Sequence, residues 1–165
     1  MKSELFKTLK LIFPELNQST QPDDPSDFDA LLIWVNATRQ NIMKMDMDEP
    51  TENLDMSYPL IKNKINTDAL AEKISDEIQE AYDHFQEGDH EQDLDHAYSY
   101  EDQMLQDIVF KNINEVADDL EMALFVIQAE NPYWLLVPVD NEMNDQLLTV
   151  FNDIYDEEMP MIMIG

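Results

Sequence analysis

The sequence predicts an α+β protein in which a helical N-terminal part packs on a small C-terminal three-stranded sheet, in the order β-β-α-β. Apolar residues recur at helical spacing through most of the chain, whereas short continuous apolar runs mark its last part. The length suits one compact domain, 1–165, and a hydrophobic fraction of 44% is ordinary for a folded protein. The acidity of the chain therefore does not indicate disorder.

Two helices are expected near the N-terminus. The first stops at Pro14, and the second opens with a Ser-x-x-Asp capping pattern at Ser26 and carries an apolar stripe as far as Ile42. The methionine-rich stretch 43–49 is expected to end this helix. Helical periodicity fails over 46–66, which predicts a long loop that hides a short element or carries contacts.

Two acidic helices are expected next. One begins at Thr67, a plausible N-cap, and ends at Gly88. The other begins with a second capping pattern, Ser99 followed by Asp102, and continues to Leu120.

The end of the chain predicts a hairpin, a helix and a third strand. The apolar runs 122–128 and 133–139 are separated by a short polar turn, and Pro138 indicates that the second strand pairs on one side only near its end. Asp140 can cap the following helix, and 160–164 has the composition of a strand.

Charge is the outlying property of this sequence. It has 37 acidic and 9 basic residues, a net charge of −28, and the imbalance grows along the chain: 1–73 carries −5, and 74–165 carries −23 with Lys111 as its one basic residue. Such a field repels nucleic acid and anionic membranes and attracts a basic partner. Direct nucleic-acid or membrane binding is therefore not expected.

The chain is expected to be soluble and cytoplasmic. It has no cysteine, which excludes disulfides and thiol chemistry. The N-terminal apolar run, Leu11–Phe13, is too short for a signal peptide, and no stretch approaches the roughly 18 apolar residues that a membrane span needs.

The two acidic helices and the segment between them form the expected partner-binding surface. Its candidate residues are Asp76, Glu80, Asp83, Glu87, Asp89, Glu91, Asp93, Asp95, Tyr98, Tyr100, Glu101, Asp102, Asp118, Asp119 and Glu121. The two tyrosines are included because amphipathic rings commonly anchor interfaces, although either could instead pack as core against the second acidic helix.

Enzyme and cofactor signatures are missing. His84, His90 and His96 are six residues apart, so no two share a helix face in the manner of a zinc protease. The sequence has only two glycines, which excludes a phosphate-binding loop and a nucleophile elbow. A calcium loop that began at Asp83 or Asp89 would have apolar or aromatic residues at ligand positions. No catalytic residue, cofactor or dedicated metal site is predicted.

Three classes of function remain open. The first is a non-enzymatic acidic protein that neutralises a basic protein, as an immunity protein against a nucleic-acid-acting toxin or a nucleic-acid mimic does. The second is an acidic scaffold or regulatory module. The third is a carboxylate-rich protein that binds divalent metal. The first accounts best for a single-sign field over more than ninety residues.

Overall fold

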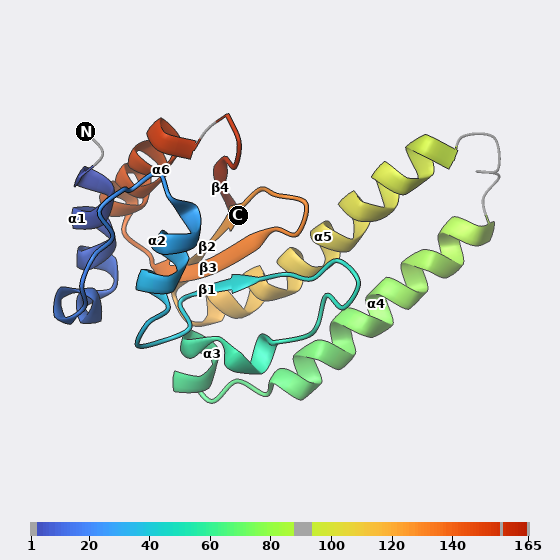
Figure 1. The fold of residues 1–165 in the computed structure, drawn as a ribbon. Helices are drawn as coiled ribbons and strands as arrows, with labels where there is room; N and C mark the ends of the chain where they lie inside the picture. The colour runs from blue at the N-terminus through green and yellow to red at the C-terminus, as the bar shows by residue number, and fades with distance from the viewer. Residues whose placement is uncertain (1–2, 88–93, 156, 165) are drawn as a thin grey trace.

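The computed structural model describes residues 3–87, 94–155 and 157–164. Its helices are α1 (Ser3–Ile12), α2 (Phe28–Val35), α3 (Tyr58–Lys62), α4 (Thr67–Glu87), α5 (Leu94–Asp119) and α6 (Asn141–Tyr155), and its strands are β1 (Ile42–Lys44), β2 (Met122–Ile127), β3 (Tyr133–Pro138) and β4 (Met161–Ile164). Short 3₁₀ helices occupy Pro14–Gln18 and Leu54–Met56. The strands form one antiparallel sheet in the order β1-β3-β2-β4, with α1, α2 and α6 on one side and α4 and α5 on the other (Figure 1).

Both faces of this sheet are covered. Phe125 and Ile127 of β2 lie in an apolar cluster with α1, α2 and α6. Leu124 and Val126, the alternate residues of the same strand, lie in a second cluster with α4 and α5. A strand that buries both of its faces has no polar positions to alternate with, which explains the continuous apolar runs of β2 and β3.

The α+β class, the β2–β3 hairpin, α6 and β4 are confirmed, but the three-stranded C-terminal sheet is wrong. A fourth strand, β1, comes from the N-terminal half and pairs with β3 through Ile42 and Leu135. The predicted second helix ends at Val35 rather than continuing through Ile42. Met43 and Met45 belong to the apolar core, so the stretch 43–49 does not end a helix. The sequence did not predict β1, because the three residues of this strand are too few to show strand periodicity.

Pro138 pairs on one side, as expected. It lies opposite Met122 of β2, whereas β1 reaches β3 only between Tyr133 and Leu135. The missing N–H of the proline therefore breaks no hydrogen bond on that outer side.

The helix starts differ by a few residues from the predicted ones. Asp27, not Ser26, caps α2 by accepting a hydrogen bond from the Ala30 N–H at 3.1 Å. Asn66, not Thr67, accepts from Ala69 N–H at 3.0 Å at the start of α4. Helix α5 begins at Leu94, so Ser99 lies inside the helix and is not its cap. The cap at Asp140 is confirmed, because its Oδ1 accepts from the Met143 N–H at 3.0 Å.

Segment 46–66 does hide short elements, since it contains a 3₁₀ turn and helix α3. The stretch is tied to the core through Leu54 and Leu60, both buried. In the part of the chain that the structure describes, no helix combines the length and apolar character that crossing a bilayer requires.

Tyr155, at the end of α6, fastens that helix to the loop before α2. Its side chain is buried, packs against Phe28 and Phe151, and donates its hydroxyl hydrogen bond to the Pro25 carbonyl. Burial raises the pKa of Tyr155 to about 12, and the nearby carboxylates Asp24 and Asp27 add to the shift.

This anchor predicts a specific loss of stability at alkaline pH. Ionisation removes the donated hydrogen and places an anion in the core, so stability that Tyr155 provides below pH 10 should disappear between pH 10 and about 12. Tyr155→Phe should lower the free energy of unfolding by about 1 kcal/mol at pH 7. Urea unfolding of both proteins from pH 7 to 11.5 should show the difference shrinking as pH rises. An unchanged difference across this range would contradict the assignment.

Candidate acidic docking surface

The hairpin of α4 and α5 is held together and to the sheet by an apolar seam. Leu70 and Ile74 of α4 and Val109 and Ile113 of α5 are buried in one cluster with Leu124 of β2. Figure 1 shows the two helices side by side, with their far halves extending past the sheet. The seam fixes the inner faces of both helices, so most of their polar residues are turned outward.

Both lysines of the hairpin belong to one network of ion pairs between the helices. Lys73 Nζ lies 2.9 Å from Glu115 Oε2, and Lys111 Nζ lies 3.7 Å from Glu77 Oε1. The hydrogen bond from Lys73 lowers the pKa of Glu115, and Glu115 raises the pKa of Lys73. The two lysines of residues 67–119 are therefore engaged with two glutamates, and the sequence of this stretch offers its other carboxylates no further lysine or arginine.

Asn112 adds a buried polar contact between the helices. Its side chain is 1% exposed and donates hydrogen bonds to Glu77 of α4 and, at 2.8 Å, to the Ile108 carbonyl. A buried asparagine that finds its partner at one position fixes the register of two helices, as it does in coiled coils. The register in turn fixes which carboxylates stand side by side along the hairpin.

The outward face of α4 carries a row of acids that we name the α4 stripe. It consists of Asp68, Glu72, Asp76 and Glu80, four residues apart in succession, with Asp83 one further turn along, and all five are exposed. Like charges at this spacing destabilise a helix by about 0.2–0.5 kcal/mol for each pair. The stripe therefore lowers the stability of the fold.

The C-terminal end of α5 also carries acidic residues at unfavourable positions. Asp118 and Asp119 are exposed in the last turn, which contains no basic residue. Carboxylates at a helix C-terminus face the negative end of the helix dipole, at a cost of about 0.3–1 kcal/mol each. Glu121 follows in the left-handed conformation, with φ of 58°, in the turn that leads to β2.

The predicted site residues fall into separate groups. Asp76, Glu80 and Asp83 lie together on the α4 stripe, while Asp118, Asp119 and Glu121 lie at the base of the hairpin, where α5 enters the sheet. Glu87, Asp95, Tyr98, Tyr100 and Glu101 are placed on α4 and α5 by their backbone. Asp89, Glu91 and Asp93 lie outside the described residues.

Asp102 does not share the outward face. It is exposed, yet it stands seven residues, or two helical turns, before Val109, which is fully buried. The same side of α5 thus changes from solvent to core along the helix. The sequence also missed two members of the α4 stripe, Asp68 and Glu72, although their four-residue spacing from Asp76 and Glu80 was available in the sequence.

No metal centre emerges from the side chains that the structure describes. Within them, no group of three or more His, Asp or Glu residues is arranged to hold an ion. Neighbouring carboxylates on the α4 stripe lie one turn apart along a helix, which spreads them in a line rather than around a point.

Comparison with protein-family models, with curated proteins and with solved structures found no match for this chain.

Neutralising part of the α4 stripe should make the protein more stable. Asp76→Asn combined with Glu80→Gln removes the repulsion of these two acids with each other and with Glu72 and Asp83. We expect a gain of about 1 kcal/mol, and so a melting temperature about 2–4 °C higher at low salt, with a smaller gain in 0.5 M NaCl. Differential scanning calorimetry measures both.

A matched variant separates stripe repulsion from acidity in general. Glu77→Gln removes one negative charge from α4, against two in the double variant, but it also removes the ion pair with Lys111 and leaves one oxygen to accept from Asn112, so it should lower the melting temperature. If both variants shifted the melting temperature in the same direction, the distinction between stripe and network would be wrong.

Proposed function

We propose that this protein is a non-enzymatic binding protein that neutralises a basic, nucleic-acid-handling protein by presenting the α4–α5 hairpin to it. The observation that carries the proposal is the α4 stripe: five exposed carboxylates along one helix face, kept at a cost in stability. A row of like charges that weakens the fold is expected where an opposite charge is bound.

The charge density of the hairpin supports mimicry of nucleic acid. Residues 67–119 hold 17 acidic residues and 2 lysines, a net charge of −15. Three of these acids lie in 88–93, outside the described residues. The 14 acids and 2 lysines of 67–87 and 94–119 leave −12 along α5, which is about 39 Å long, or about one net charge for every 3.3 Å. Duplex DNA carries one for about every 1.7 Å. A channel lined with Lys and Arg for phosphates would thus meet a pair of helices with about half the charge density of the duplex.

The location of the hairpin also supports this use. Its far half extends past the sheet, so a partner can approach the α4 stripe without contacting α1, α2 or α6 (Figure 1). Steering by such a field raises association rates by about 10 to 10³ at low salt. Fast capture is what an inhibitor needs when its target acts on abundant nucleic acid.

The experiment compares two variants of equal charge. The stripe variant carries Asp68→Asn, Glu72→Gln, Asp76→Asn and Glu80→Gln. The control variant carries four neutralisations on and after α6, on the other side of the sheet: Asp145→Asn, Asp153→Asn, Glu157→Gln and Glu158→Gln. All eight residues are exposed. Each protein is immobilised, exposed to native lysate, and eluted with a salt gradient for mass spectrometry.

We expect basic nucleic-acid-binding proteins to be retained by the original chain and by the control variant but lost from the stripe variant. With a purified partner, the stripe variant should associate at least about tenfold more slowly at low salt, and duplex DNA should compete with binding. If both variants lost the retained proteins equally, net charge alone would explain retention and the α4 stripe would have no special role. Binding that does not change with salt or with added DNA would refute the proposal.

The base of the hairpin can be tested separately. Asp118→Asn, Asp119→Asn and Glu121→Gln should slow association while leaving the fold intact or more stable, because these acids oppose the helix dipole. Stopped-flow or surface-based kinetics, together with thermal unfolding, measure the two effects. Unchanged kinetics would confine the docking surface to the α4 stripe.

A further inference from the structure

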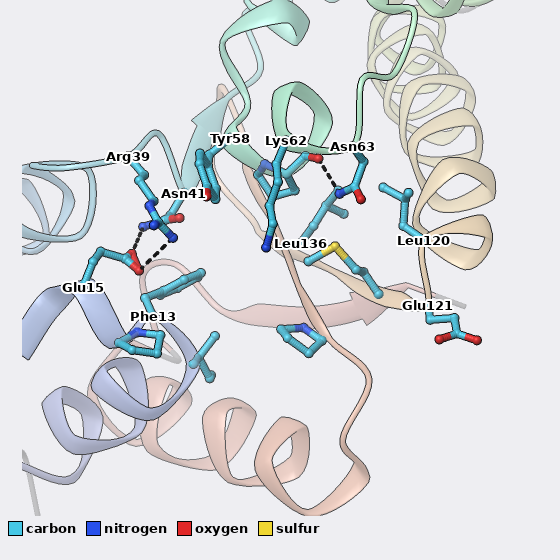
Figure 2. Close-up of a pocket in the computed structure, with 15 residues that line it drawn as sticks. Phe13, Glu15, Arg39, Asn41, Tyr58, Lys62, Asn63, Leu120, Glu121 and Leu136 are labelled. Carbon is cyan, nitrogen blue, oxygen red and sulfur yellow. Dashed lines mark hydrogen bonds and ion pairs between the residues drawn. The ribbon is translucent and has the colours of Figure 1, made fainter.

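A pocket lies at the end of the molecule where α1, α3 and the α5–β2 turn meet (Figure 2). Its volume is about 520 Å³, within the range of small-molecule sites. One wall of the pocket is apolar. Phe13 and Leu136 in this wall are almost fully buried, so the more exposed Met122 and Pro138 supply most of its accessible surface. Such a wall favours the apolar part of a ligand.

The polar side of the pocket contains Arg39, the one arginine of the sequence. Its guanidinium lies 4.2 Å from the centre of the Tyr58 ring and 3.7 Å from Glu15 Oε1. Glu15 is itself held, since its Oε2 accepts from Asn41 Nδ2 at 3.3 Å. The cation is thus positioned before any ligand arrives, which reduces the entropy lost on binding.

Arg39 is more open than the carboxylate that holds it. The side chain of Arg39 is 40% exposed, whereas that of Glu15 is 11% exposed. A guanidinium has five N–H donors in a planar fork, and one ion pair at 3.7 Å leaves donors for a second carboxylate.

Lys62 supplies a second cation to the same pocket. It is exposed in the last turn of α3, and Figure 2 shows its side chain extending from α3 into the pocket. The other lining carboxylate, Glu121, stands at the far edge of Figure 2, well separated from Arg39 and Lys62. The four charged side chains of the lining, Arg39, Lys62, Glu15 and Glu121, sum to zero, and the separation of Glu121 leaves the positive excess on the side of Arg39 and Lys62.

We propose that this pocket binds a small organic carboxylate with an apolar body, such as an aryl- or alkyl-carboxylic acid. The carboxylate would bind Arg39 and Lys62, and the apolar body would lie against Phe13, Met122 and Pro138. The site shares Glu121 with the base of the hairpin but differs from the α4 stripe in place and in sign of charge, and neither proposal depends on the other.

The test uses 4-phenylbutyrate as the probe, with 4-phenylbutyramide, acetate and inorganic phosphate for comparison. Titrations are followed by ¹H–¹⁵N correlation spectra of the full chain in 0.15 M NaCl. We expect saturable shifts at Phe13, Tyr58, Lys62 and Leu136 with 4-phenylbutyrate, and binding at least about threefold weaker for its amide and for acetate. If the amide bound equally well, the cations would have no part in binding. If acetate or phosphate bound equally well, the apolar wall would have none.

Substitutions of Lys62 and Arg39 test whether these two cations bind the carboxylate. Lys62→Gln should weaken 4-phenylbutyrate binding by about threefold to fivefold, whereas Lys7→Gln, an equal charge change at an exposed position on α1, should not. Arg39→Lys keeps the charge but loses the fork, and should weaken binding while preserving the spectrum elsewhere. The proposal is overturned if Lys62→Gln binds as the original chain does, or if 10 mM 4-phenylbutyrate leaves the pocket resonances unmoved.

Discussion

Apolar burial beneath α4 and α5 holds in place a row of carboxylates that repel one another, and the proposed docking surface depends on that opposition. Ile74, Val109 and Ile113 are fully buried between the helices and the sheet. Burying such a side chain contributes about 1.5–3 kcal/mol, whereas each like-charge pair on the α4 stripe opposes folding by a few tenths. The seam is therefore strong enough to offset the repulsion along the α4 stripe.

A few polar contacts then fix the alignment of α4 and α5 more closely than the apolar seam alone would. Asn112 and the pairs Lys73–Glu115 and Lys111–Glu77 set how α4 and α5 are aligned. They also engage both lysines of the hairpin at its inner edge. The positive charges thus contribute to alignment, and the outward face remains negative.

Sequence patterns were enough for the elements that bury a long stripe or a long run. The runs that became β2 and β3 predicted their hairpin, and Pro138 predicted its one-sided pairing, because continuous apolar composition and a missing N–H act locally. Strand β1 was not predicted, because its three residues show no periodicity and its partner strand lies about ninety positions further along the chain. Ser99 was wrongly predicted to be an N-cap, because serine is also tolerated inside a helix when no glycine or proline interrupts the helix.

The candidate sites show the same limit. Exposed acids could be assigned to helices from their spacing, but the two faces of α5 could not be told apart at Asp102, because its exposure depends on where the sheet ends. The pocket could not be predicted at all. Phe13, Arg39 and Lys62 are spread over fifty positions and meet only through the packing of α1, α3 and β3.

The central claim is that negative charge is concentrated along the α4 stripe rather than spread evenly over the molecule. The most direct measurement is the near-surface electrostatic potential, obtained from paramagnetic relaxation of backbone amides by a cationic nitroxide and its neutral analogue. The account predicts the largest cationic-to-neutral ratio at residues 68–83 and a clearly smaller one along α6. Similar ratios on both helices would contradict it.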